Sequence, residues 1–136
     1  MSGAIGVEQV IKLPTILAGR RSNARHFQEV MKPLEGKIRI QRETGSSSWF
    51  GFSMIVNPDF LSKKNLLDVL GPLGVDTRPI VGGNFVRNPV MKYLNHYEIP
   101  DLNNADIVHD HGLFIGNHHF DIRDKLSQIA EALGEI

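Results

Sequence analysis

The apolar residues between Ala4 and Met31 recur mainly at steps of three and four, which is the period of an α-helix. This long helical pattern constrains the fold most, because an apolar stripe must be covered by something. Pro14 falls inside the pattern and has no N–H group, so it should break or kink the helix, and we predict a short helix to about Lys12 and a longer amphipathic helix to about Met31. The first part packs either on the sheet of this chain or on a partner.

The remaining sequence alternates between strand and helix patterns. Strands are predicted where polar and apolar residues alternate or aromatic and β-branched residues gather, at 37–42, 46–56, 75–79 and 113–116. A helix with Ser62 as its capping residue and a Gly71-Pro72 stop is predicted at 61–73, and an amphipathic helix runs from about Ile122 to Leu133. Shorter helical turns are predicted at 88–94 and 104–111. This order indicates the α/β class.

Composition limits the classes of function. With 136 residues, 41 % of them apolar, the chain is long enough for one core, and we expect a single domain over residues 1–136. Its 15 basic and 15 acidic residues cancel, which argues against nucleic acid or an anionic membrane as partner. Cysteine is absent, so disulfides, thiolate zinc sites and a cysteine nucleophile are excluded. No spanning apolar run or signal peptide is evident, and we expect a cytoplasmic protein.

Two segments, 77–89 and 108–119, combine glycine with arginine, asparagine and histidine beside short apolar runs. A hydrophobic core does not need this mixture of residues. A loop that holds a polar ligand does need it, because glycine lets the backbone approach the ligand while Arg, Asn and His supply hydrogen-bond donors. The two segments therefore predict a ligand-facing surface.

The segments TRPIVGGNFVRNP and HDHGLFIGNHHFDI, together with SSSWFGFSMIV and the opening MSGAIGVEQVIKLPTILAGRRSNA, resemble the carboxyl-terminal domain of the PLP-dependent nucleotide-sugar aminotransferase and 3-dehydratase family. Within it they are most similar to the enzymes acting on GDP-4-keto-6-deoxymannose and to perosamine-type aminotransferases. The resemblance implies a small, mostly antiparallel sheet covered by helices, as in the small domain of the aspartate aminotransferase fold. It also implies a role in deoxysugar synthesis for surface polysaccharide.

The same resemblance implies what this chain lacks. The part of the family that carries the cofactor lysine or its histidine replacement, the aspartate under the pyridine nitrogen and the phosphate cup has no counterpart here. We therefore expect a fragment that binds and orients a sugar nucleotide, holds no PLP by itself and is not catalytic alone. Its expected partners are the nucleotide sugar and either the missing large domain or a second copy of the chain.

Arg87 is the leading candidate for the diphosphate, because it sits among glycines and asparagines where a guanidinium can bind bidentately; a surface salt bridge is the alternative. Arg78 either points toward the ligand or pairs with a carboxylate such as Asp76. Asn84 supplies neutral donors, and Phe85 packs either on the ligand or in a small core.

His111, Asn117 and His118 complete the predicted substrate-binding set. Amino-acid aminotransferases of this fold place a carboxylate-binding arginine at the position that His111 resembles, so the histidine questions how an amino donor would be held. Asn117 and His118 face the sugar or cofactor, unless Asn117 caps the last helix.

Two rival functions remain open. One is a non-catalytic binding or interaction domain. The other is a metalloenzyme built on Asp110, His111, His118 and His119, although adjacent histidines on a strand would point to opposite faces. Trp49, Phe50 and Phe52 are expected in the core or an interface.

Overall fold

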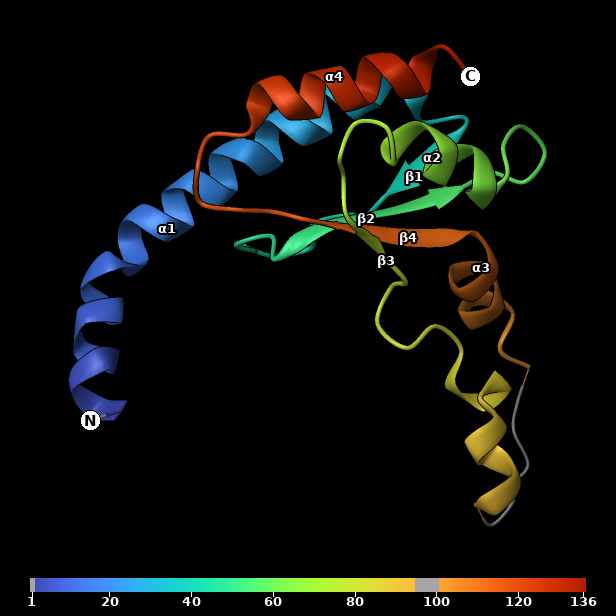
Figure 1. The fold of residues 1–136 in the computed structure, drawn as a ribbon, viewed down its shortest axis with the longest axis horizontal. Helices are drawn as coiled ribbons and strands as arrows, with labels where there is room; N and C mark the ends of the chain where they lie inside the picture. Colours follow the sequence, from blue (N-terminus) through green and yellow to red (C-terminus); the bar gives the residue numbers. More distant parts are fainter. Residues whose placement is uncertain (1, 95–100) are drawn as a thin grey trace.

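The sheet is antiparallel and has four strands. The computed structural model describes residues 2–94 and 101–136. Neighbouring strands pair in the order β1-β2-β4-β3, and every pair is antiparallel. The strands are β1 (Ile38–Ile40), β2 (Gly51–Val56), β3 (Thr77–Arg78) and β4 (Gly112–Gly116). The predicted small antiparallel sheet with covering helices is confirmed (Figure 1).

The helices lie before, between and after these strands. They are α1 (Ser2–Met31), α2 (Lys63–Leu70), α3 (Asn103–His111) and α4 (Arg123–Gly134), with short 3-10 turns η1 (Lys32–Leu34), η2 (Phe85–Arg87) and η3 (Pro89–Tyr93). The predicted cap is present, since Ser62 and Asn65 form a reciprocal capping box at the start of α2. No helix within the described residues is both long and apolar enough to cross a membrane.

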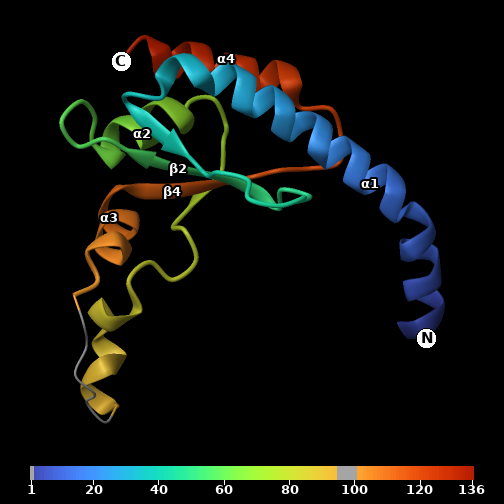
Figure 2. The ribbon, with the colours of Figure 1, turned by 180° about the vertical axis from the view of Figure 1, so that it is seen from behind.

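One face of the sheet is covered by helices. The second half of α1 lies alongside α4 over the strands, as both views of the ribbon show (Figures 1 and 2). Side chains alternate along β2, so that Phe52, Met54 and Val56 are buried under these helices. Phe27 of α1 stacks on Phe52 with ring centroids 4.2 Å apart. Burial of this face supplies the hydrophobic stabilisation of the fold.

The predicted break at Pro14 is wrong, because α1 is a single helix that contains this proline. Pro14 is exposed, so water can satisfy the backbone carbonyl that loses its helical partner. The helix instead curves away from the sheet, and its first half extends beyond the strands (Figure 1). Ile5, Val10 and Ile11 are all more than 60 % exposed, so packing of this part on the sheet of the chain is also wrong.

The predicted strand at 46–56 begins only at Gly51. Trp49 adopts a positive φ of 49°, which no strand allows, and its side chain is buried. Phe50 next to it is 74 % exposed. Trp49 and Phe52 therefore share the core side although they are three positions apart, because the turn at Trp49 interrupts the alternation on which the prediction relied.

Gly19 marks the closest approach between α1 and the loop that follows β4. A Cβ atom at this position would lie 2.1 Å from the backbone oxygen of His119. Only a residue without a side chain lets the helix and the loop pack so closely.

Replacing Gly19 by alanine should therefore destabilise the protein, by about 1–3 kcal/mol, because a rigid backbone must move to accept the methyl group. Urea unfolding followed by circular dichroism measures this. Gly6→Ala is the matched control: nothing lies within 4 Å of its added Cβ, and helix propensity predicts no loss and a gain of up to about 1 kcal/mol. Equal stabilisation by both substitutions would contradict the close approach.

Candidate functional site

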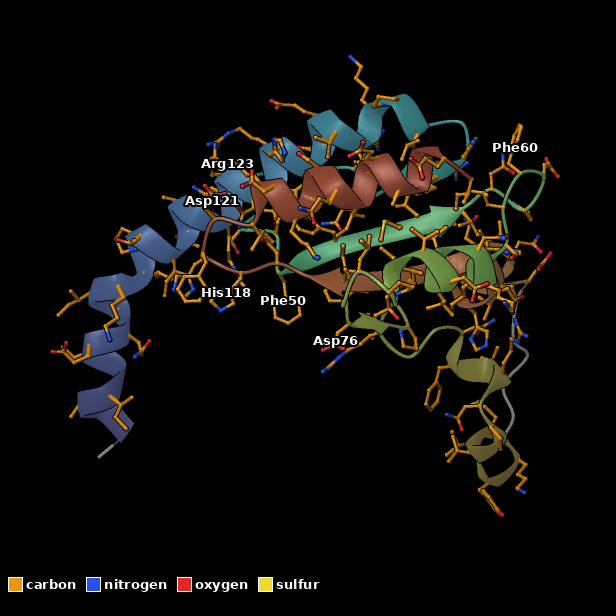
Figure 3. All side chains as sticks on the ribbon, turned by 45° about the horizontal axis from the view of Figure 1, so that its top comes forward. Phe50, Phe60, Asp76, His118, Asp121 and Arg123 are labelled. Atoms are coloured by element: carbon orange, nitrogen blue, oxygen red, sulfur yellow. The ribbon has the colours of Figure 1, made fainter. Side chains whose placement is uncertain are left out.

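Three side chains stand in a row on the uncovered face of the sheet. The strand register pairs Ser53 of β2 with Phe114 of β4, and Phe114 in turn with Arg78 of β3. Directly paired residues project to the same face of a sheet. This row therefore faces away from α1 and α4, where Figure 3 shows Phe50 and Asp76 projecting from the same side.

A cavity of about 740 Å³ opens over this row. Its apolar wall includes Phe50 and Phe114, whose rings stack with centroids 5.8 Å apart. The guanidinium carbon of Arg20 lies 5.5 Å from the centroid of Phe50. The cavity thus joins the loop before β2, the edge strand β3 and the middle of α1.

The charged lining of the cavity is mainly positive. Arg20 and Arg78 are basic, and Asp76 is acidic. Among the described residues the ion pairs do not include an Asp76–Arg78 pair, so the alternative in which this carboxylate pins Arg78 is not what the structure holds. Two guanidinium groups beside exposed aromatic rings suit a ligand that has both an anionic group and a flat or apolar part.

Val81 at the rim of the cavity has an unusual backbone. Its φ is 51°, and 97 % of its side chain is exposed. A β-branched residue in the left-handed region is strained, and such strain gathers at functional sites. This supports the cavity as the site, although the sequence offered no signal for it.

Asn117 lines the same cavity but its amide is fully engaged in the protein. It donates to the carbonyl oxygens of Arg20 and Trp49, at 3.1 and 2.9 Å, and accepts from Asn23 at 3.3 Å. Its side chain is 6 % exposed. Asn117 therefore joins three segments that form the cavity wall, and α4 is not capped by it.

Asn84 and Arg87 lie apart from this cavity, beside α3. Arg87 donates to both carboxylate oxygens of Asp110 at 2.8 Å and to Asp106 at 3.3 Å. The hydrogen bond from Arg87 is the main cause that holds the pKa of Asp110 below its usual value. Buried Asn84 donates to Asp106 at 2.9 Å. The guanidinium of Arg87 is thus paired beside α3, and the arginines that line the large cavity are Arg20 and Arg78.

The other predicted site residues are dispersed. Phe85 is 56 % exposed on η2, and His111 ends α3. His118 lies in the loop after β4, where its ring stacks on Phe120 with centroids 4.1 Å apart. His119 is close to it, with ring centroids 4.3 Å apart, so the two histidines do not occupy opposite faces of a strand.

A metal centre is not assembled by the described residues. No group of three histidine, aspartate or glutamate side chains among them converges as metal ligands would. Neither a lysine nor a histidine is among the described residues that line the large cavity, so this lining offers no side chain to which PLP could be attached. Its residues fit contact with a ligand better than attachment of a cofactor.

The sequence did not single out Arg20 and Phe50, which line the cavity, and it did not indicate that Arg87 pairs with Asp106 and Asp110. The sequence pattern places Arg20 on the solvated or interfacial side of a helix, and Phe50 was expected in a core or interface. Both reach the cavity only because the turn at Trp49 presents Phe50 outward beneath α1. Finding this arrangement would have required knowledge of how the strands pair, which the sequence pattern does not give.

Comparison with known proteins identifies the family of this chain. The model of the DegT/DnrJ/EryC1/StrS aminotransferase family matches residues 1–134, and the chain therefore belongs to that family. A GDP-4-keto-6-deoxy-D-mannose 3-dehydratase from Escherichia coli is 42 % identical over 98 % of this chain, and one from Yersinia pseudotuberculosis is 39 % identical. This chain spans only 34 % of the length of each of these relatives.

Solved structures give the same result. The E. coli GDP-4-keto-6-deoxy-D-mannose-3-dehydratase with bound hydrated PLP matches 98 % of this chain with a TM-score of 0.90 and 41 % identity, and the chain covers 34 % of it. Helicobacter pylori PseC, an aminotransferase of pseudoaminic acid biosynthesis, matches with a TM-score of 0.80 at 16 % identity, which shows the fold alone. The fold expected from the family resemblance is thus confirmed.

The role of Asn117 is testable. In Asn117→Asp a carboxylate would face the carbonyl oxygens of Arg20 and Trp49, so we expect a loss of about 3 kcal/mol or more in the free energy of unfolding. Asn104→Asp, at an exposed position in the first turn of α3, should change stability by less than about 0.5 kcal/mol. Urea unfolding of both variants provides the comparison, and equal effects would contradict the structural role.

Proposed function

We propose that this chain is the ligand-facing portion of a PLP-dependent enzyme of nucleotide-sugar biosynthesis, and that its large cavity contacts the sugar nucleotide. The observation that carries this proposal is the row of Ser53, Phe114 and Arg78 under an open cavity with a second arginine at its rim. A nucleotide sugar has the matching parts: an anionic diphosphate, a flat base and a polar sugar.

The relatives indicate which sugar nucleotide to test. Both curated relatives described above are named as 3-dehydratases of GDP-4-keto-6-deoxy-D-mannose, and a solved structure of such an enzyme contains GDP-perosamine. We therefore propose a GDP-linked 6-deoxyhexose as the ligand class. Dehydration is the favoured reaction of the whole enzyme, with transamination as the alternative.

The residues of this chain would bind and orient rather than transform. Arg78 and Arg20 would meet the diphosphate, and Phe50 would cover a flat or apolar part of the ligand. Asn117 would hold the wall of the cavity, while Asn84, Phe85 and Arg87 would form its neighbouring loop. His111 and His118 remain proposed contacts at the ends of β4. PLP supplies the electron sink of such reactions when it is bound, and we propose that this chain does not hold it.

The exposed apolar side chains in the first half of α1 support the proposal that a partner covers this part of the helix. Ile5, Val7, Val10, Ile11 and Leu13 are between 45 % and 67 % exposed, more apolar surface than a helix usually leaves in water. We propose that this face is covered by the portion of the enzyme that the chain does not span in its relatives. The chain is proposed to form a single domain over residues 1–136 whichever function it has. The rival function is a non-catalytic binding or interaction domain, which would keep the cavity and need no such cover.

The proposal is tested in a hybrid that joins this chain to the portion of the E. coli relative that it does not span. Arg78→Ala should weaken GDP-perosamine binding about tenfold or more, roughly 1.4 kcal/mol, because a charged contact to the diphosphate is lost. Isothermal titration calorimetry measures the affinity. Arg39→Ala, on the exposed side of β1 and outside the cavity, is the matched control and should bind normally.

Unchanged affinity of the Arg78→Ala hybrid would contradict the proposed site. Arg87→Ala in the same hybrid decides between its two roles. A loss as large as that of Arg78→Ala would add Arg87 to the ligand contacts, and a smaller loss would leave it as a structural partner of Asp110.

A further inference from the structure

The segment from Pro79 to Leu94, which includes η2 and η3, has little regular structure of its own and rests on one face of α3. Side chains at positions 106, 109 and 110 of α3 contact it, and this spacing places them on the same side of a helix. Figures 1 and 2 show the segment running beside α3, away from the helix-covered side of the sheet. How it is attached therefore decides how one rim of the cavity is placed.

His109 makes the contact that involves the backbone of the segment. The N–H of Asn84 points at Nδ1 of His109 with a distance of 3.1 Å. An imidazole nitrogen accepts a hydrogen bond only when it carries no proton. The contact thus requires a neutral ring with its proton on Nε2.

A glycine next to Asn84 makes this contact possible. Gly83 has a φ of 63°, and a Cβ atom at that position would lie 2.4 Å from Nδ1 of His109. Only glycine allows the backbone to approach the ring in this way. The two carboxylate contacts of Arg87, by comparison, lie at side chains that are more than 40 % exposed, where ion pairs contribute little.

We propose that neutral His109 is the positioning residue that fixes the 79–94 segment against α3, and that protonation of its ring releases the segment. A protonated ring presents an N–H to the N–H of Asn84, so two donors face each other. The segment is therefore held while the ring is neutral and freed when the ring carries a proton. The inference concerns this chain alone and does not depend on the proposed ligand.

Charged groups of both signs lie around His109. Asp106, Asp110 and His111 share α3 with His109, Arg87 faces it from η2, and Lys63 of α2 donates to its backbone oxygen at 3.2 Å. The strands against which α3 packs, β2 and β4, carry no titratable side chain. These carboxylate, ammonium and guanidinium groups are the charges that the described residues place around the ring.

The test compares two substitutions at the same position. In His109→Asn the Oδ1 atom can take the place of Nδ1 and cannot titrate, whereas His109→Phe keeps a ring and has no acceptor. NMR measurement of amide exchange gives the protection factor of the Asn84 N–H between pH 5 and 8.5, corrected for intrinsic exchange. His111→Asn is the control for loss of a histidine on the same helix.

For the unaltered chain and His111→Asn, we expect protection to fall about tenfold or more toward low pH, as loss of one hydrogen bond produces. For His109→Asn protection should be independent of pH, and for His109→Phe it should be low throughout, while the amides of β2 stay protected in all four proteins. Retention of the pH dependence in His109→Asn, or full protection in His109→Phe, would overturn the proposal. So would uniform loss of protection in β2, which would show a general structural effect.

Discussion

The fold depends on the hydrogen bonds by which Asn23 of α1 holds the loop between β4 and α4. Its amide nitrogen donates to the backbone oxygens of His118 and Phe120 at 2.9 and 2.7 Å, and its oxygen accepts from the N–H of Ile122 at 3.3 Å. Asn23 is 1 % exposed, so these groups have no water to replace the bonds. Through Asn117 the same cluster reaches the turn at Trp49.

This cluster explains why α1 and α4 cover the same face of the sheet. It fixes α1 beside the start of α4, and both helices then bury the same face of the strands. The opposite face keeps Ser53, Phe114 and Arg78 accessible, and Phe50 leaves the core at the turn that Asn117 holds. A surface that can bind a ligand is thus a direct result of where the core lies.

Much of this architecture could be predicted from the sequence, because hydrophobic periodicity and capping are local signals. The class of the fold, the cap at Ser62 and the terminal helix follow from such patterns. The continuity of α1 through Pro14 could not be predicted from the sequence, since it depends on an exposed backbone carbonyl that water satisfies. The turn at Trp49 could not be predicted either, because its positive φ accompanies burial of the indole and a hydrogen bond from Asn117, 68 positions along the chain, which are not local signals.

The candidate site was predictable in its segments but not in its partners. Glycine with Arg and Asn singled out the segment 77–89, and Arg78 of this segment lines the cavity. The same pattern favoured Arg87 as an anion contact, whereas two aspartates on a helix far along the chain occupy it. His109 drew no attention because its role is visible only when Asn84 is placed beside it.

We propose that this chain supplies a ligand-binding wall and that PLP is held by the portion of the relatives that this chain does not span. Gel filtration after incubation with PLP, followed by visible absorption of the protein peak, tests this most directly. The account predicts no retained PLP on the 136-residue chain and about one per chain on the hybrid with the E. coli relative. Stoichiometric PLP retained by the chain alone, and fixed to one of its lysines by borohydride, would contradict it.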